Sequence, residues 1–278
     1  MRYRIEHTTR YDYADEVFVE PQTIRLSPRS DPAQRLVSHA LVVEPGPAGM
    51  SRHLDAEGNS VCEIWFSGQT RRLEIALTSE VETLRANPYD YISPFDQPLG
   101  LPFRYRHEAS ALAFYRRGPI APRVAAFAEA IAKSAGGTAL EFLTALNHRL
   151  HDEWKVEPRW RGLPWGATRT LDTRRGACRD LSMLFVAASR ALGLAARFVS
   201  GYHEGDPEQS ESHLHAWAEV YIPGGGWRGF DPTGGLAVAD RHVAVAAARL
   251  PRDAAPVSGS FRGFGPVRMV ADVRIDRL

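Results

Sequence analysis

The sequence lacks the features that would place it outside ordinary globular proteins. Cysteine occurs only at positions 62 and 178, so neither a disulfide framework nor a CxxC zinc site can be built. The 34 basic residues nearly balance the 33 acidic ones, so no global field attracts nucleic acid or an anionic membrane. There is no apolar run of the roughly 18 residues that a membrane span needs, and the charged start has no signal-peptide core. We therefore expect a cytoplasmic protein.

The first part of the chain has the pattern of an antiparallel β domain. Apolar and polar residues alternate, as half-buried strands require, in 36–45, 60–67 and 71–84. Cys62 lies in one of these segments, and we interpret it as a small buried hydrophobe. Prolines and aromatics crowd residues 86–121, which is typical of a linker without regular elements. The pattern predicts a β-sandwich-like domain over residues 1–105, with a Pro-rich linker from about residue 86.

The rest of the chain reads as helices followed by strands. Helices are expected at 122–135, after the capping-box pair Thr138 and Glu141, and from Cys178 to Gly193. Strands are expected at about 195–202, 214–222, 227–231 and 267–278, with loops and a short helix between 236 and 263. The predicted fold class is therefore α+β, with an N-terminal antiparallel β-sandwich-like domain followed, in residues 106–278, by helices packed on an antiparallel sheet.

Cys178 is the first candidate for chemistry. It follows Gly176 in a turn that opens an apolar helix, where unpaired backbone N–H groups favour a thiolate and can donate to an oxyanion. The alternative is a buried small residue at a helix start, which the charged neighbours Arg179 and Asp180 make less comfortable.

The candidate histidines lie in a segment of period two. His213, His215 and Trp217 share one face with Glu219, while the opposite face is apolar. Such a face is expected where a sheet borders a cleft. Two histidines with Cys178 also allow a metal site, although no fourth ligand is indicated. Spacing alone leaves open which histidine acts in catalysis.

Asp231 ends the strand that follows a glycine-rich turn at 223–226. The hairpin brings this strand beside the one that holds His215, so the carboxylate can accept a hydrogen bond from the imidazole. Thiol, imidazole and carboxylate in this order are the parts of a nucleophilic cysteine triad. Alternatively, Asp231 caps a turn before Pro232.

Three segments together resemble the transglutaminase-like superfamily, which has a papain-like core. They are GACRD at Gly176–Asp180, HAWAEVYIPGGGW at His215–Trp227 and FDPT at Phe230–Thr233. The resemblance implies a triad of Cys178, His215 and Asp231. The start, YRIEHTTRYDY, is similar to the β domain that precedes the core in many bacterial members. An acidic calcium cluster and zinc-bearing CxxC pairs are not evident, so no metal or other cofactor is implied.

The resemblance predicts a bacterial cysteine enzyme with two domains, residues 1–105 and the catalytic core 106–278. Cys178 would attack a carboxamide or peptide carbonyl to form a thioester, which an amine acceptor or water resolves. We expect a protein or peptide substrate and no nucleic-acid or membrane partner. Weaker candidates for an oxyanion or cleft-lining role are Trp160, Trp165, His213 and Trp217.

Two other classes of function stay open from the sequence. One is a binding or assembly module on the same scaffold. Loss of the triad residues would distinguish such a module from an enzyme. The other is a metal-dependent hydrolase that uses Cys178, His213 and His215, which predicts stoichiometric zinc in the purified protein. The loops that would shape specificity carry no recognisable substrate code.

Overall fold

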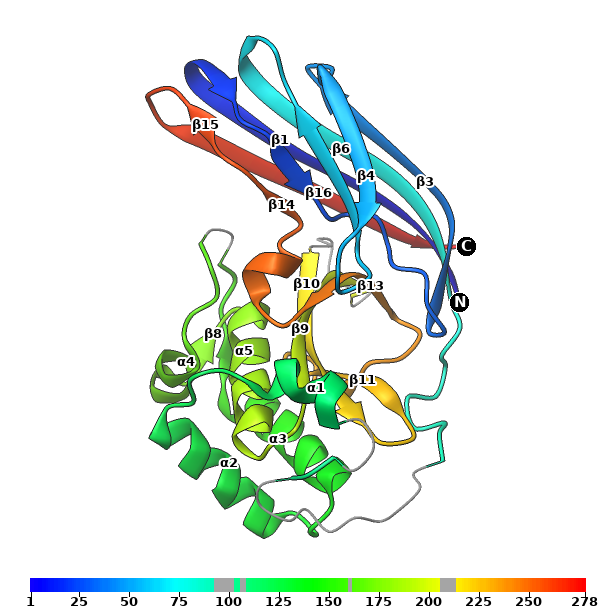
Figure 1. The fold of residues 1–278 in the computed structure, drawn as a ribbon, viewed down its shortest axis with the longest axis vertical. Coiled ribbons are helices and arrows are strands. Elements are labelled where there is room, and N and C mark those ends of the chain that lie inside the picture. Colours follow the sequence, from blue (N-terminus) through cyan, green and yellow to red (C-terminus); the bar gives the residue numbers. More distant parts are fainter. Residues whose placement is uncertain (93–102, 106–108, 160–161, 206–213) are drawn as a thin grey trace.

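The computed structural model describes residues 1–92, 103–105, 109–159, 162–205 and 214–278 (Figure 1). Two antiparallel sheets form the N-terminal part. The first has β1 (Arg2–Val19) at its centre and contains β15 (Phe261–Arg262), β16 (Val267–Arg277), β6 (Gln69–Thr83) and β3 (Gln34–Glu44). The second runs in the order β14 (Val257–Ser258), β2 (Gln22–Ile24), β5 (Ser60–Trp65) and β4 (Gly49–Leu54).

The two sheets share one apolar core. In β6 buried residues alternate with more exposed ones, as the alternation in the sequence predicts. Cys62 on β5 belongs to this core together with Ile64 and Ile75. Its exposed fraction is 9%. Its interpretation as a small buried hydrophobe is confirmed.

The last strands of the chain return to these N-terminal sheets. β16 pairs with β1 along its whole length, from Tyr3 opposite Arg277 to Tyr13 opposite Val267, which brings the two termini together (Figure 1). The predicted closing strand is therefore present. The division at residue 105 stays a prediction, although β14, β15 and β16 extend the N-terminal sheets.

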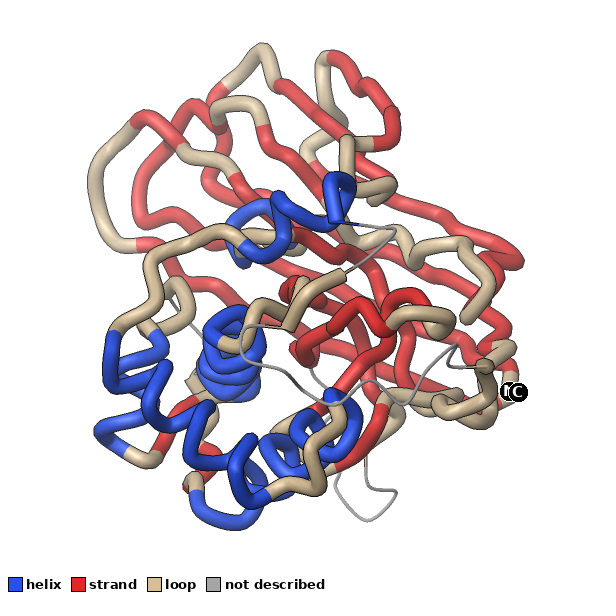
Figure 2. Tube along the Cα trace, turned by 60° about the horizontal axis from the view of Figure 1, so that its bottom comes forward, coloured by secondary structure: helices blue, strands red, loops and turns tan. Residues whose placement is uncertain are grey.

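Helices and a further antiparallel sheet make up the rest of the molecule (Figure 2). The helices are α1 (Ala109–Arg116), α2 (Pro122–Ser134), α3 (Ala139–Glu153), α4 (Ala167–Thr173) and α5 (Cys178–Ala191). The sheet runs in the order β12 (Leu236–Ala237), β11 (Gly226–Asp231), β10 (Leu214–Ile222), β9 (Ala196–His203) and β13 (His242–Ala248). The short β7 (Lys155–Val156) and β8 (Arg175–Gly176) pair in parallel, and a 3-10 helix, η1, spans Pro251–Ala254.

The predicted α+β fold class is confirmed, and so is the Thr138–Glu141 capping box, in which both reciprocal hydrogen bonds are present. Several elements were not expected, and α1 and β13 are two of them. The Pro-rich segment contains α1, and the segment expected to hold only loops and a short helix contains β13. Among the described residues, no helix is both long and apolar enough to cross a lipid bilayer.

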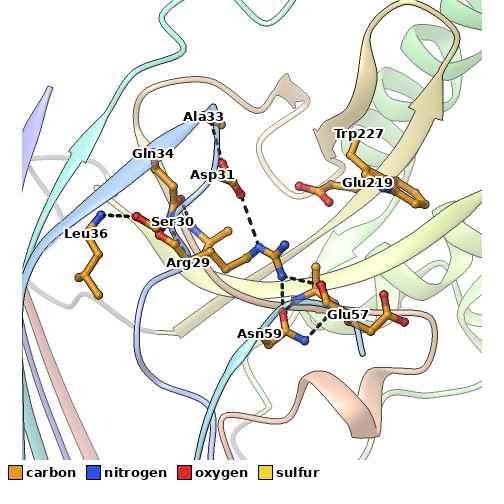
Figure 3. Close-up of polar contacts among 12 residues, drawn as sticks. Arg29, Ser30, Asp31, Ala33, Gln34, Leu36, Glu57, Asn59, Glu219 and Trp227 are labelled. Atoms are coloured by element: carbon orange, nitrogen blue, oxygen red, sulfur yellow. Dashed lines mark hydrogen bonds and ion pairs between the residues drawn. The ribbon is translucent and has the colours of Figure 1, made fainter. Parts of the chain in front are cut away.

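β13 is an edge strand whose outer edge is occupied by side-chain amides from the N-terminal part. Gln34 exchanges two hydrogen bonds with the backbone of Ala244, at 2.8 and 2.9 Å. Asn59 does the same with Ala247, also at 2.8 and 2.9 Å. Arg29 in turn donates to the amide oxygen of Asn59 (Figure 3). These amides satisfy backbone groups that an edge strand would otherwise leave unpaired, and they fix β13 against the N-terminal sheets.

Candidate active site

Cys178 is the first residue of α5 and is partly exposed, whereas Cys62 is buried. Asp180 caps the start of this helix, because its Oδ2 accepts a hydrogen bond from the backbone N–H of Ala177 at 2.9 Å. A carboxylate in the first turn also complements the positive end of the helix dipole. The sulfur therefore sits where backbone N–H groups create positive potential.

The helix that carries Cys178 contacts both strands that carry the other two candidate residues. The Ser182 hydroxyl lies 2.8 Å from the carbonyl oxygen of Cys178 and 3.1 Å from that of Ala216, which is next to His215 on β10. Phe185 stacks on Phe230 of β11 with ring centroids 5.4 Å apart. Because α5 is packed against the neighbours of both residues, the three functional groups are held on rigid elements.

The structure brings His215 between Cys178 and Asp231. His215 Nε2 lies 2.7 Å from Asp231 Oδ2 and donates its hydrogen to that carboxylate. The Cys178 side chain also interacts with the imidazole and contributes to raising its pKa. The other carboxylate oxygen of Asp231 accepts from the backbone N–H of Thr233 at 2.9 Å and of Gly234 at 3.3 Å. With Nε2 committed to Asp231, Nδ1 is the nitrogen left to exchange a proton with the thiol.

Electrostatics favour an imidazolium–carboxylate pair. Burial lowers the pKa of His215, but the charge of Asp231, their hydrogen bond and the contact with Cys178 together raise it to about 10. Burial raises the pKa of Asp231, yet the charge of His215 and the hydrogen bonds from His215 and His242 hold it well below its ordinary value. His215 is therefore protonated, and Asp231 ionised, at neutral pH.

Two further histidines, which the sequence analysis missed, complete the cluster. His242, the first residue of β13, lies with Nε2 3.2 Å from Asp231 Oδ2. His203 on β9 packs against it with ring centroids 4.3 Å apart. Burial lowers the pKa of both imidazoles, that of His203 to about 4. The sequence analysis did not predict β13. A histidine at the start of that strand was the sequence signal that would have pointed to His242.

Asp180, considered before only as a neighbour of the cysteine, organises the loop in front of α5. Its Oδ1 accepts from Arg159 at 2.6 Å and from the backbone N–H of Trp165 at 2.7 Å. Gly176 lies in β8 rather than in the expected turn and is needed for space, since an added Cβ would lie 2.8 Å from the Cβ of Asp180. Burial and the charge of Arg159 lower the pKa of Arg179.

Two of the four candidates for an oxyanion or cleft-lining role lie in the described part of the structure, in different surroundings. Trp160 and His213 lie outside the described residues. Trp165 lies at the loop that Asp180 anchors, with the Arg169 guanidinium 3.9 Å from its ring centroid. Trp217 is only 1% exposed, so it does not line an exposed cleft. It packs against residues of β9 and β13, namely Val199, Ala244 and Ala247.

Within the described ranges, one group of atoms is close enough to hold a metal ion: nitrogen and oxygen atoms of His215, Asp231 and His242, all within 4.8 Å of one another. This set differs from the Cys178, His213 and His215 considered from the sequence. The hydrogen bonds from both imidazoles to Asp231 account for the grouping.

Sequence comparisons find related proteins over nearly the whole chain. The family model described as the bacterial transglutaminase-like N-terminal region matches residues 3–82, and that of the transglutaminase-like superfamily matches residues 125–232. An uncharacterised protein of Mycobacterium tuberculosis is 30% identical over 298 residues, covering 99% of this chain and 92% of that protein. A protein-glutamine γ-glutamyltransferase of Pseudomonas aeruginosa is 30% identical over 122 residues, 40% of this chain and 18% of that protein.

Among solved structures, a candidate cysteine protease from Cytophaga hutchinsonii has a TM-score of 0.72 with 20% sequence identity, covering 99% of this chain and 90% of that one. At this identity the likeness concerns the fold. It confirms the predicted arrangement of N-terminal antiparallel sheets together with a transglutaminase-like core.

Proposed function

The chain belongs to the transglutaminase-like superfamily, and we propose that it is a cysteine acyl-transfer enzyme acting on carboxamide or peptide bonds. The observation that carries the proposal is the arrangement of Cys178 and Asp231 around His215. Asp231 accepts the Nε2 hydrogen, and both residues raise the pKa of the imidazole. The three residues come from the start of a helix and from two paired strands, and His215 is held protonated beside the thiol. A binding module has no need of such an arrangement, so we favour an enzyme.

In the first half of the reaction, the proton of the Cys178 thiol resides on His215 Nδ1, and the thiolate sulfur bonds to the substrate carbonyl carbon. The carbonyl electrons move to oxygen, and the N–H groups at the start of α5 can stabilise that oxyanion. Collapse of this intermediate breaks the C–N bond. His215 gives its proton to the departing nitrogen, which leaves as ammonia or an amine, and a thioester remains on Cys178.

In the second half, His215 takes a proton from the incoming nucleophile, which bonds to the thioester carbonyl and releases the thiolate. An amine yields a new amide, whereas water yields a carboxylic acid. Throughout, Asp231 accepts the Nε2 hydrogen, which fixes the tautomer and stabilises the imidazolium. The P. aeruginosa relative is named for transfer of a γ-glutamyl group from protein glutamine and the C. hutchinsonii neighbour for proteolysis. We include both outcomes in the proposal.

Ammonia release from a glutaminyl dipeptide tests the reaction, measured with and without hydroxylamine as the amine acceptor. Release that needs hydroxylamine and yields the hydroxamate supports transamidation, and release in water alone supports hydrolysis. Cleavage of an unfolded casein, followed by mass spectrometry, tests peptide bonds. Each activity should vanish in Cys178→Ala and persist in Cys62→Ala, because Cys62 lies in the core between the N-terminal sheets. Turnover that survives in Cys178→Ala would contradict the proposal.

A further inference from the structure

Asp231 receives two imidazoles on the same oxygen. Oδ2 lies 2.7 Å from His215 Nε2 and 3.2 Å from His242 Nε2. A carboxylate oxygen can only accept hydrogen bonds, so both nitrogens carry the hydrogen. The triad described above uses the first of these contacts and leaves the second without a role.

His242 is held firmly in its place. Its side chain is 2% exposed, and its ring packs on His203 at 4.3 Å and edge-on against Trp217 at 5.2 Å between centroids. It begins β13, the strand that Gln34 and Asn59 anchor from the N-terminal part (Figure 3). The position of the second donor is therefore set by packing rather than by Asp231 itself.

We propose that His242 is a positioning residue, which orients the Asp231 carboxylate toward His215 and acts on Cys178 only through that pair. This inference rests on the proposed function. The backbone N–H groups of Thr233 and Gly234 hold Oδ1, and His242 holds Oδ2 together with His215. With donors on both oxygens, rotation of the carboxylate breaks hydrogen bonds at each end, so Oδ2 stays directed at His215.

A neutral donor suits this position better than a cation. Burial lowers the pKa of His242 although Asp231 opposes the shift, so the ring donates a hydrogen bond without adding a positive charge. A second cation on the same oxygen would neutralise the carboxylate and weaken its hold on the imidazolium of His215. His203, itself neutral, packs against the ring.

Two substitutions of His242 separate donation from packing. In His242→Gln the amide nitrogen reaches about as far as Nε2 and keeps a neutral donor. In His242→Leu a similar volume is kept without a donor. The readout is the second-order rate of Cys178 alkylation by iodoacetamide between about pH 6 and 9, followed by intact mass, a range chosen because an ordinary thiol ionises near pH 8.5. Thermal unfolding of each variant shows whether it is folded.

We expect His242→Leu to slow labelling about tenfold near pH 6.5 and much less near pH 9, with His242→Gln within about threefold of the wild type throughout. Once a substrate is known, the same loss should fall on kcat rather than KM. Labelling of folded His242→Leu at the wild-type rate overturns the positioning role alone, and so does equal slowing in the Gln and Leu variants. Wild-type labelling no faster than that of an ordinary thiol overturns the proposed function as well.

Discussion

Replacing Asp231 by asparagine tests the electrostatic core of the site with almost no change in shape. The amide oxygen can still accept from the backbone N–H groups of Thr233 and Gly234. The amide NH2 group then faces the Nε2 atoms of His215 and His242, where the carboxylate accepted their hydrogens. To pair with an NH2 group, His215 must present a bare Nε2 and move its hydrogen to Nδ1, the nitrogen that should receive the thiol proton.

The effect of Asp231→Asn on the Cys178 thiolate depends on the pKa of the His215 imidazole. The pKa of His215 is raised from 6.5 to about 10, so the net interaction of the imidazolium with its surroundings is favourable although burial opposes it. Asp231 supplies the largest favourable part of it. Without that charge, burial lowers the pKa of His215 below 6.5, so the ring is neutral at neutral pH and no longer stabilises a thiolate on Cys178.

Alkylation of Cys178 as a function of pH measures this directly. An ordinary thiol is about 1% thiolate near pH 6.5, while a thiolate stabilised by an ion pair is somewhat less nucleophilic. We therefore expect Asp231→Asn to slow labelling at least about tenfold near pH 6.5, with the two rates converging above about pH 9. Cys62→Ala is the matched control and should label like the wild type. Equal rates for wild type and folded Asp231→Asn at every pH would refute the reasoning.

Three other outcomes follow from the structure. Asn59→Ala removes both hydrogen bonds to Ala247 and leaves buried backbone groups unpaired, so chemical denaturation should show a loss of about 2–4 kcal/mol; a loss below 1 kcal/mol would contradict the anchoring of β13. Gly176→Ala places a Cβ 2.8 Å from that of Asp180, so we expect a lower melting temperature and slower labelling of the active-site thiol. An unchanged melting temperature would argue against that close contact. The raised pKa of His215 contributes stability that is complete below about pH 6.5 and is lost as pH approaches about 10; denaturation of His215→Gln, compared with wild type across this range, should lack that part of the pH dependence.

The sequence predicts the parts of the site whose geometry is local. A glycine followed by Cys178 and an apolar run predicts a helix start, and the β10–β11 hairpin brings His215 next to Asp231. Period-two alternation likewise predicts the N-terminal strands, because each has one face toward a shared core.

The parts that the sequence did not predict depend on distant segments. β13 reads HVAVAAA and lacks a polar face, because Gln34 and Asn59 cover its edge and buried residues pack on its sides. The role of Asp180 similarly arises from Arg159 and Trp165, which the fold brings to it. Neither arrangement has a fixed spacing that a pattern could detect.

Trapping of the acyl-enzyme tests the central proposal most directly. The wild type and Cys178→Ala are mixed with an activated ester and quenched in acid after a short interval. Intact-mass spectrometry then measures the number of acyl groups per chain, and sequencing of the modified peptide locates them. We expect one acyl group per chain on Cys178, lost on incubation with hydroxylamine as a thioester would be. Acylation of other side chains only, or equal acylation of Cys178→Ala, would contradict a cysteine acyl-transfer mechanism.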